Sequence, residues 1–221
     1  MKKTSIAIVV TAVISCGIMA LIDGVIQPGY AVKSAVKLAL FLGIPFILSR
    51  FDRSLSFAEL FRFRKKGFAV ALGLGLGVYG LIVGGYFLVR NFFDFSGIAG
   101  KLTQNAGVTR DNFLFISLYI SFINSLLEEF FFRGFQFVTL KKYTGAKFAH
   151  LFSSGLFALY HVAMMIGWFS PVLFILVMAG LTVGGMLFNF MNQRLGSIYP
   201  SWLTHMFANF AINTIGFMLM A

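Results

Sequence analysis

Apolar stretches separated by short polar segments follow one another along the whole chain. Several of them run for about 18 residues or more, which is enough to cross a bilayer as a helix. We therefore predict an all-α, polytopic transmembrane helix bundle. Its seven expected spans are 4–22, 31–49, 68–89, 112–140, 147–166, 171–190 and 197–220.

The composition of the chain also indicates a membrane protein. Of 221 residues, 59% are hydrophobic and only 11% are charged, whereas a soluble domain carries about 25% charged residues. The spans leave no room for a soluble domain, so residues 1–221 are expected to form a single membrane-embedded domain. We expect a multi-pass protein of the cell membrane, with the lipid bilayer as its constant partner.

The net charge of +11 does not indicate a nucleic-acid partner, because the basic residues stand between apolar segments and not along one face. Their distribution follows the positive-inside rule and predicts a cytoplasmic N-terminus. This orientation leaves Arg90, Lys101 and Arg110 outside. The basic residues that it places in the cytoplasm are Arg50, Arg53, Arg62, Arg64, Lys65, Lys66, Lys141, Lys142, Lys147 and Arg194.

Two other features of the first half have a predicted role. Segment 50–66 mixes arginines with phenylalanines, which predicts a basic helix lying on the inner leaflet. Lys33 and Lys37 lie within the second span, where they either snorkel to the interface or line the interior.

Glycines recur at a spacing of four in the third and sixth spans. Such spacing lets another helix approach closely in a membrane, so we predict a packing role. A literal match to the dinucleotide-binding glycine pattern at 75–80 is rejected, because it lies inside an apolar run. The spaced pairs are Gly73 with Gly77, Gly80 with Gly84, and Gly180 with Gly184.

A small set of polar side chains lies within otherwise apolar spans. Ionisable groups cost about 3 kcal/mol or more at the bilayer centre, so they mark function by default. Counted from the nearest cytoplasmic charges at 1.5 Å per residue, the glutamates and two histidines of the set lie at a similar depth, roughly 16–20 Å. The set comprises Asn124, Glu128, Glu129 and Arg133 in the fourth span, His161 in the fifth, and Ser201, His205, Asn209 and Asn213 along one stripe of the seventh.

Not every member of this set is expected to act chemically. Glu129 and Arg133 are one turn apart, which predicts a structural ion pair. Glu128 points about 100° away from Glu129 and is free to face a cavity, unless burial keeps it as a neutral acid. For His161 and His205 the alternative is a satisfied interior histidine.

The residue types narrow the reaction class to hydrolysis at a carbonyl group, and we expect that group to belong to a peptide bond. The sequence has neither a Gly-x-Ser-x-Gly elbow nor a His-Glu-x-x-His motif. A glutamate beside a histidine activates water as a general base, and a second histidine with an asparagine binds a developing oxyanion. Zinc held by Glu128, His161 and His205 is also chemically sound, so the residue types leave a metal open.

Three short motifs, in order and each within a span, carry a resemblance to a known family. They are Glu128-Glu129-Phe-Phe-Phe-Arg133, Phe157-Ala-Leu-Tyr-His161 and His205-Met-Phe-Ala-Asn209. In these motifs the chain resembles the CPBP intramembrane proteases, the CAAX-processing and bacteriocin-processing group also called Abi proteins. The resemblance covers about half of the chain, roughly residues 112–220, and the first three spans add nothing specific.

The resemblance implies a helical bundle whose cavity opens towards the cytoplasm. It assigns water activation to Glu128 and His161 and the oxyanion hole to His205 and Asn209. The second glutamate and the arginine of the first motif would support the site. No cofactor is expected, with zinc as the alternative. The expected substrate is a membrane-associated peptide or protein. A prenylated protein, a peptide pheromone and a bacteriocin leader are the three candidates.

Two other classes of function are weighed against this one. A proton-coupled transporter would use Glu128 and Glu129 as relay groups, but short loops and the lack of a visible repeat count against it. A non-catalytic scaffold or immunity protein would not need four candidate groups at one depth.

Overall fold

The computed structural model describes residues 3–52, 55–63, 65 and 67–220, with the backbone alone at residues 105 and 106. Within these ranges there are seven helices long and apolar enough to cross a membrane, and no strand. The predicted all-α, seven-span architecture is therefore confirmed. The spans are Lys3–Ile26, Tyr30–Phe51, Phe68–Val89, Arg110–Thr144, Ala146–Met165, Pro171–Leu195 and Tyr199–Met220.

The first half of the chain supplies the first three spans, which were predicted, and one short helix, which was not. This helix, α5, connects the third span to the fourth. It is followed by Gly107, whose φ of +63° favours glycine. The elements of this half are α1 (Lys3–Leu21), the π-helical turn η1 (Ile22–Ile26), α2 (Tyr30–Leu38), η2 (Ala39–Gly43), α3 (Ile44–Phe51), α4 (Phe68–Val89) and α5 (Gly97–Ala106).

The fourth span is the longest, at 35 residues, against the roughly 20 that a bilayer requires. It extends beyond the predicted 112–140 at both ends. Two stretches of it are π-helical, with backbone bonds five residues apart, a form that is often found at functional sites. Its segments are α6 (Arg110–Tyr119), η4 (Ile120–Asn124), α7 (Ser125–Glu128), η5 (Glu129–Val138) and α8 (Thr139–Thr144).

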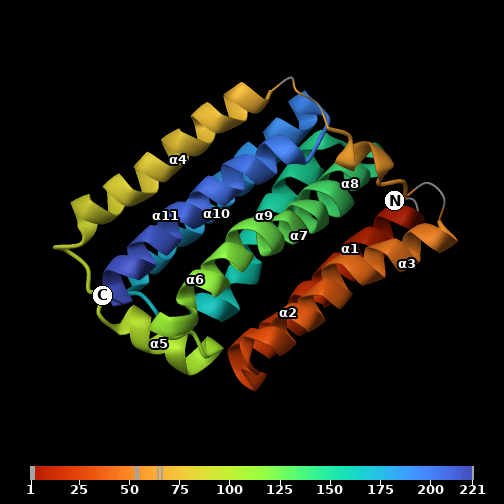
Figure 1. Ribbon diagram of the computed structural model, residues 1–221. Helices are drawn as coiled ribbons and strands as arrows, with labels where there is room; N and C mark the ends of the chain where they lie inside the picture. Colours follow the sequence, from red (N-terminus) through yellow and green to blue (C-terminus); the bar gives the residue numbers. More distant parts are fainter. Residues whose placement is uncertain (1–2, 53–54, 64, 66, 221) are drawn as a thin grey trace.

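The last three spans complete the bundle as α9 (Ala146–Met165), α10 (Pro171–Leu195) and α11 (Tyr199–Met220). In Figure 1, α4 runs along one edge of the bundle and the hairpin of α1 with α2 and α3 along the other. α4 packs on α11, α10 packs on α9, and α1 packs on α9. The long fourth span lies between these edges and contacts α9, α10 and α11.

Contacts between distant segments bring the expected cytoplasmic loops to one end of the bundle. Thr4 donates a hydrogen bond to Asp52 at 2.7 Å, which joins the start of α1 to the end of α3. The backbone N–H of Ile198, just before α11, donates to the carbonyl of Leu60 at 3.1 Å. Arg53, Arg64 and Lys66, on which the predicted orientation also relies, lie outside the described residues.

The predicted basic helix over 50–66 is wrong for the residues that the structure describes. Its regular part is a single short 3₁₀ turn, η3 (Ala58–Phe61). Leu55, Phe57 and Leu60 are buried, and the ring of Phe57 meets that of Phe130 edge to face at 5.1 Å. Phe57 therefore packs on the fourth span, whereas Phe51 and Phe63 of the same segment remain exposed.

The predicted glycine contacts are also wrong, because they involve the wrong face of each helix. A Cβ atom added at any of the spaced pairs, Gly73 and Gly77 among them, meets no atom within 4 Å in the described structure. The close approach is at Gly75, where an added Cβ lies 2.5 Å from the Phe207 ring of α11. At Gly185 in α10 it lies 3.0 Å from the Cβ of Ser154.

Polar and apolar side chains are distributed as expected for a bundle surrounded by lipid. Leu81 and Leu88 of α4 are 75% and 76% exposed, whereas Glu129 and Arg133 are fully buried. Apolar contact with lipid costs nothing, but a charge in the interior must be matched by a partner. The interior charges are therefore the part of the molecule whose arrangement must be explained.

Candidate functional site

The polar stripe of α11 faces the fourth span along its whole length, as its spacing of four predicts. Each of its four side chains bonds to a group of that span. The contacts join Ser201 Oγ to Glu129 Oε2 at 2.6 Å, His205 Nδ1 to Glu129 Oε1 at 3.0 Å, Asn209 Nδ2 to the Ile120 carbonyl at 3.2 Å, and Asn213 Nδ2 to the Ser117 carbonyl at 3.2 Å.

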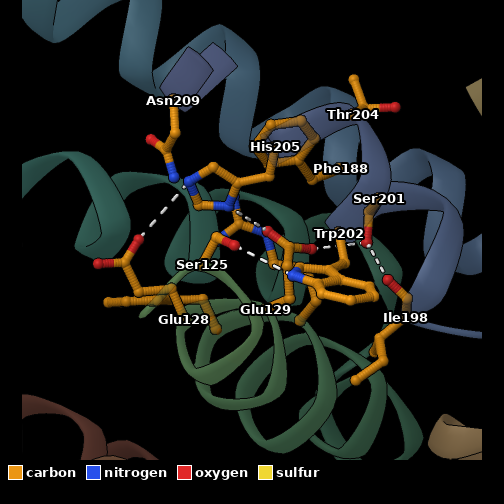
Figure 2. A network of polar contacts seen from close by, with 12 residues as sticks. Ser125, Glu128, Glu129, Phe188, Ile198, Ser201, Trp202, Thr204, His205 and Asn209 are labelled. Carbon is orange, nitrogen blue, oxygen red and sulfur yellow. Dashed lines mark hydrogen bonds and ion pairs between the residues drawn. The ribbon is translucent and has the colours of Figure 1, made fainter. Parts of the chain in front are cut away.

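His205 lies between the two adjacent carboxylates. Its Nδ1 is 3.0 Å from Glu129 Oε1, and its Nε2 is 3.7 Å from Glu128 Oε2 (Figure 2). The predicted separation of about 100° around the helix thus leaves both carboxylates within reach of the same histidine. The helix widens into η5 at Glu129, and both carboxylates flank the same imidazole.

Glu129 is the centre of this network, because groups from its own helix and from α11 converge on its carboxylate. Arg133 Nε lies 3.5 Å from Oε1, and both side chains are fully buried. The expected ion pair is thus present. Ser201 donates to Oε2, and Asn192 of α10 donates in turn to Ser201 Oγ at 2.6 Å. Asn192 was not identified from the sequence, because it lies beyond the predicted end of the sixth span at residue 190.

Aromatic rings fix the cation and the imidazole relative to each other. The guanidinium of Arg133 lies 4.2 Å from the ring centre of Phe157 and 5.0 Å from that of Phe188, distances at which a cation is attracted to a ring face. Phe188 also stacks on His205, with centroids 5.1 Å apart and planes at 21°. α9 and α10 therefore hold Arg133 of the fourth span and His205 of the seventh span in place.

His161 approaches the site from α9 with a defined tautomer. Its Nδ1 lies 2.7 Å from the carbonyl of Phe157, and since a carbonyl only accepts, Nδ1 carries the proton. In the neutral ring the lone pair is then on Nε2. Glu128, Lys37 and His205 are close enough to act on it electrostatically, so the two histidines and the first glutamate share one region of the bundle.

Lys37 of α2 makes a strong contact with Glu128 that the sequence did not predict. Its Nζ lies 2.5 Å from Glu128 Oε1 and 2.6 Å from Asn124 Oδ1, and the side chain is buried. Of the two predicted placements, lining the interior is therefore the one observed. The rule that identified Glu128, an ionisable group within an apolar span, already applied to Lys37.

The two oxygens of Glu128 have different surroundings. Oε1 accepts from Lys37 and also from Asn124 Nδ2 at 3.1 Å. Oε2 faces His205. Asn209 lies one turn further along α11, beside His205 in Figure 2, and uses one of its two amide hydrogens on the Ile120 carbonyl. The remaining histidine, His150, is not part of this set; its Nε2 lies 3.0 Å from Gln193 Oε1 near the start of α9.

The zinc alternative requires three protein ligands, and among the described residues no group of three histidine, cysteine, aspartate or glutamate side chains is arranged to hold a metal ion. The Lys37 ammonium is also within 2.5 Å of Glu128 Oε1, and a dication on this carboxylate would face a like charge.

A comparison with family models matches residues 110–211 to the family described as type II CAAX prenyl endopeptidase Rce1-like. The match begins at the first residue of α6 and ends within α11, so it includes all three motifs. It confirms the resemblance to CPBP proteases over this part of the chain. No curated protein and no solved structure matched the chain.

Proposed function

From the match of residues 110–211 to the Rce1-like type II CAAX prenyl endopeptidases, we propose that this multi-pass membrane protein is an intramembrane endopeptidase of the cell membrane. Its substrate is a membrane-associated or prenylated peptide or protein. The observation that carries the proposal is the position of His205 between Glu128 and Glu129, with its two ring nitrogens 3.7 and 3.0 Å from their oxygens.

Water activation is assigned to Glu128 with His161. A carboxylate within hydrogen-bonding reach of water removes a proton as the oxygen attacks the carbonyl carbon. His161 supports this step through Nε2, which bears the lone pair because Nδ1–H is bonded to Phe157. The proton taken from water then passes to the amine nitrogen as the C–N bond of the peptide breaks, so that the amine leaves as a neutral group.

The oxyanion that forms on the carbonyl oxygen is assigned to His205 and Asn209. Nδ1 of His205 lies 3.0 Å from Glu129 Oε1, and we assign the hydrogen bond to the oxyanion to the other ring nitrogen, Nε2. The second amide hydrogen of Asn209 donates beside it. Donors fixed in advance where charge develops lower the barrier most effectively, since they need no reorganisation.

Glu129 and Arg133 support the site without touching the substrate. Glu129 orients His205 and Arg133 compensates its charge, while Phe157 and Phe188 hold the guanidinium. A residue that sets the tautomer and orientation of a histidine has a large effect on rate even though it takes no part in bond changes.

We propose that the reaction proceeds without a metal. Glu128 and His161 suffice for water activation, and His205 with Asn209 for the oxyanion. Asn209 is a poor zinc ligand and a good hydrogen-bond donor. The ammonium of Lys37 beside Glu128 supports the same view.

A prenylated or otherwise membrane-bound substrate suits a site enclosed by apolar spans. An isoprenoid chain partitions into the bilayer, which holds the attached peptide at the membrane surface next to the protein. A peptide pheromone or a bacteriocin leader would have to enter by its own apolar residues. The family match favours hydrolysis over the proton-coupled transporter and the non-catalytic scaffold.

The test is a cleavage assay with the purified protein in liposomes. A synthetic peptide with a C-terminal farnesylated cysteine motif is compared with the same peptide lacking the lipid, and products are identified by mass spectrometry. We expect cleavage of the lipidated peptide and none with Glu128→Ala. Equal cleavage by wild type and Glu128→Ala, or cleavage of no membrane-associated peptide at all, would contradict the proposal.

A further inference from the structure

The charges around the site are balanced by a residue that lies outside the family match. Glu128 and Glu129 are buried side by side, and Arg133 compensates Glu129. The second compensating cation is Lys37, from the second span, which precedes the matched residues 110–211. A buried carboxylate without a partner is costly, so the second span contributes a compensating charge from outside the matched segment.

The contacts of Lys37 also distinguish the two oxygens of Glu128. Lys37 Nζ and Asn124 Nδ2 both donate to Oε1, at 2.5 and 3.1 Å. Lys37 is itself held by Asn124 Oδ1 at 2.6 Å and lies 4.9 Å from the ring centre of Tyr160. Neither of the two contacts to Glu128 involves Oε2, which is the oxygen that faces His205.

Resting on the proposed function, we infer that Lys37 is a positioning residue that holds Glu128 as a carboxylate through Oε1 and leaves Oε2 as the oxygen that takes the proton from water. A carboxylate accepts at both oxygens. When one oxygen is occupied by a fixed ammonium and a fixed amide, the other has a single orientation relative to His205. Lys37 therefore acts through Glu128 and does not touch the substrate.

The second intramembrane lysine of α2 provides a matched control. Lys33 lies one turn before Lys37 and pairs with Asp23 at 3.0 Å. It is likewise largely buried and ion-paired, but its partner belongs to η1 and not to the fourth span. Neutralising Lys33 removes the same charge from the same helix without touching Glu128.

The first experiment measures kcat and KM for the lipidated peptide in liposomes. Lys37→Gln, which still donates a hydrogen bond but has no charge, is expected to lower kcat by about 10- to 100-fold with KM unchanged, less than the loss of the base itself. Lys37→Arg is expected to restore much of kcat, and Lys33→Gln to leave it at the wild-type level. An unchanged kcat for Lys37→Gln would overturn the inference. An increased kcat would overturn it as well, because it would show that Lys37 lowers the activity of Glu128.

The second experiment measures thermal unfolding and does not depend on activity. Lys37→Met is expected to lower the melting temperature, and the added Glu128→Gln to recover most of the loss, because the double variant no longer buries an unmatched charge. Additive losses in the double variant would overturn the pairing. If this recovery is found while the wild type cleaves no peptide, the proposed function fails and the ion pair stands.

Discussion

At the scale of single residues, the depth of a polar side chain in its span was predictable, but its partner was not. Glu128, His161 and His205 lie in one region of the bundle, as their similar distances from the cytoplasmic charges predict. The sequence could not show that Lys37 would meet Glu128, since 91 positions separate them and no periodicity links the two spans. Which of two buried carboxylates faces which cation depends on the rotation of each helix, and that rotation is a tertiary property.

Arg133 gives a stability prediction at this scale. Arg133→Ala leaves Glu129 buried without its cation, and we expect it to lower the free energy of unfolding by about 3–5 kcal/mol. The double variant Glu129→Leu with Arg133→Leu should recover much of this loss. Melting of the purified proteins in one detergent measures both. An Arg133→Ala protein that melts normally but cleaves nothing would instead assign Arg133 to the catalytic set.

Metal content is the second prediction for the residues of the site. Because Lys37 already occupies Oε1 of Glu128, we expect purified, active protein to carry no stoichiometric zinc. Elemental analysis of the wild type and of His161→Ala measures this directly. One tightly held zinc per chain, lost together with activity in His161→Ala, would contradict the metal-free mechanism.

At the scale of helices, the existence of the spans was predictable and their packing faces were not. Length and apolar composition identify a span, but lipid and protein interior are both apolar, so hydrophobicity does not show which face is buried. This is why the spaced glycines of α4 were assigned a contact that Gly75 makes instead. The π-helical turns of the fourth span also leave no periodic signal in a sequence of mixed aromatic residues.

The packing of α4 on α11 can be tested with two neighbouring glycines. Gly75→Ala places a Cβ 2.5 Å from the Phe207 ring, whereas Gly77→Ala meets no described atom within 4 Å. Alanine favours a helix by about 1 kcal/mol over glycine, but overpacking costs about 1–3 kcal/mol. We expect Gly75→Ala to melt below Gly77→Ala. The reverse order in thermal unfolding would show that α4 does not lie on α11 by this face.

At the scale of the whole molecule, the site belongs to both halves of the chain. The matched segment 110–211 holds the three motifs, while α2 supplies a cation to Glu128 and α1 packs against α9. The sequence alone assigned nothing specific to the first three spans, because charge compensation is visible only once the helices are assembled.

The orientation of the bundle is the prediction that belongs to this scale. Lys65 and Arg90 are both exposed, and the positive-inside rule places the first in the cytoplasm and the second outside. In a Cys16→Ser background, intact cells are treated with a membrane-impermeant thiol reagent. We expect Arg90→Cys to react and Lys65→Cys to react only after the cells are opened. The opposite pattern would invert the assigned topology.

The central claim is that Glu128 removes the proton from the attacking water, and the most direct test is the turnover of Glu128→Gln. The amide keeps the size of the side chain but cannot act as a general base, whose loss costs about 100- to 10,000-fold in rate. The assay compares single-turnover cleavage of the lipidated peptide by wild type and variant in liposomes, with folding verified by circular dichroism. We predict a folded Glu128→Gln protein whose cleavage rate falls within that range; turnover close to wild type would remove Glu128 from the mechanism.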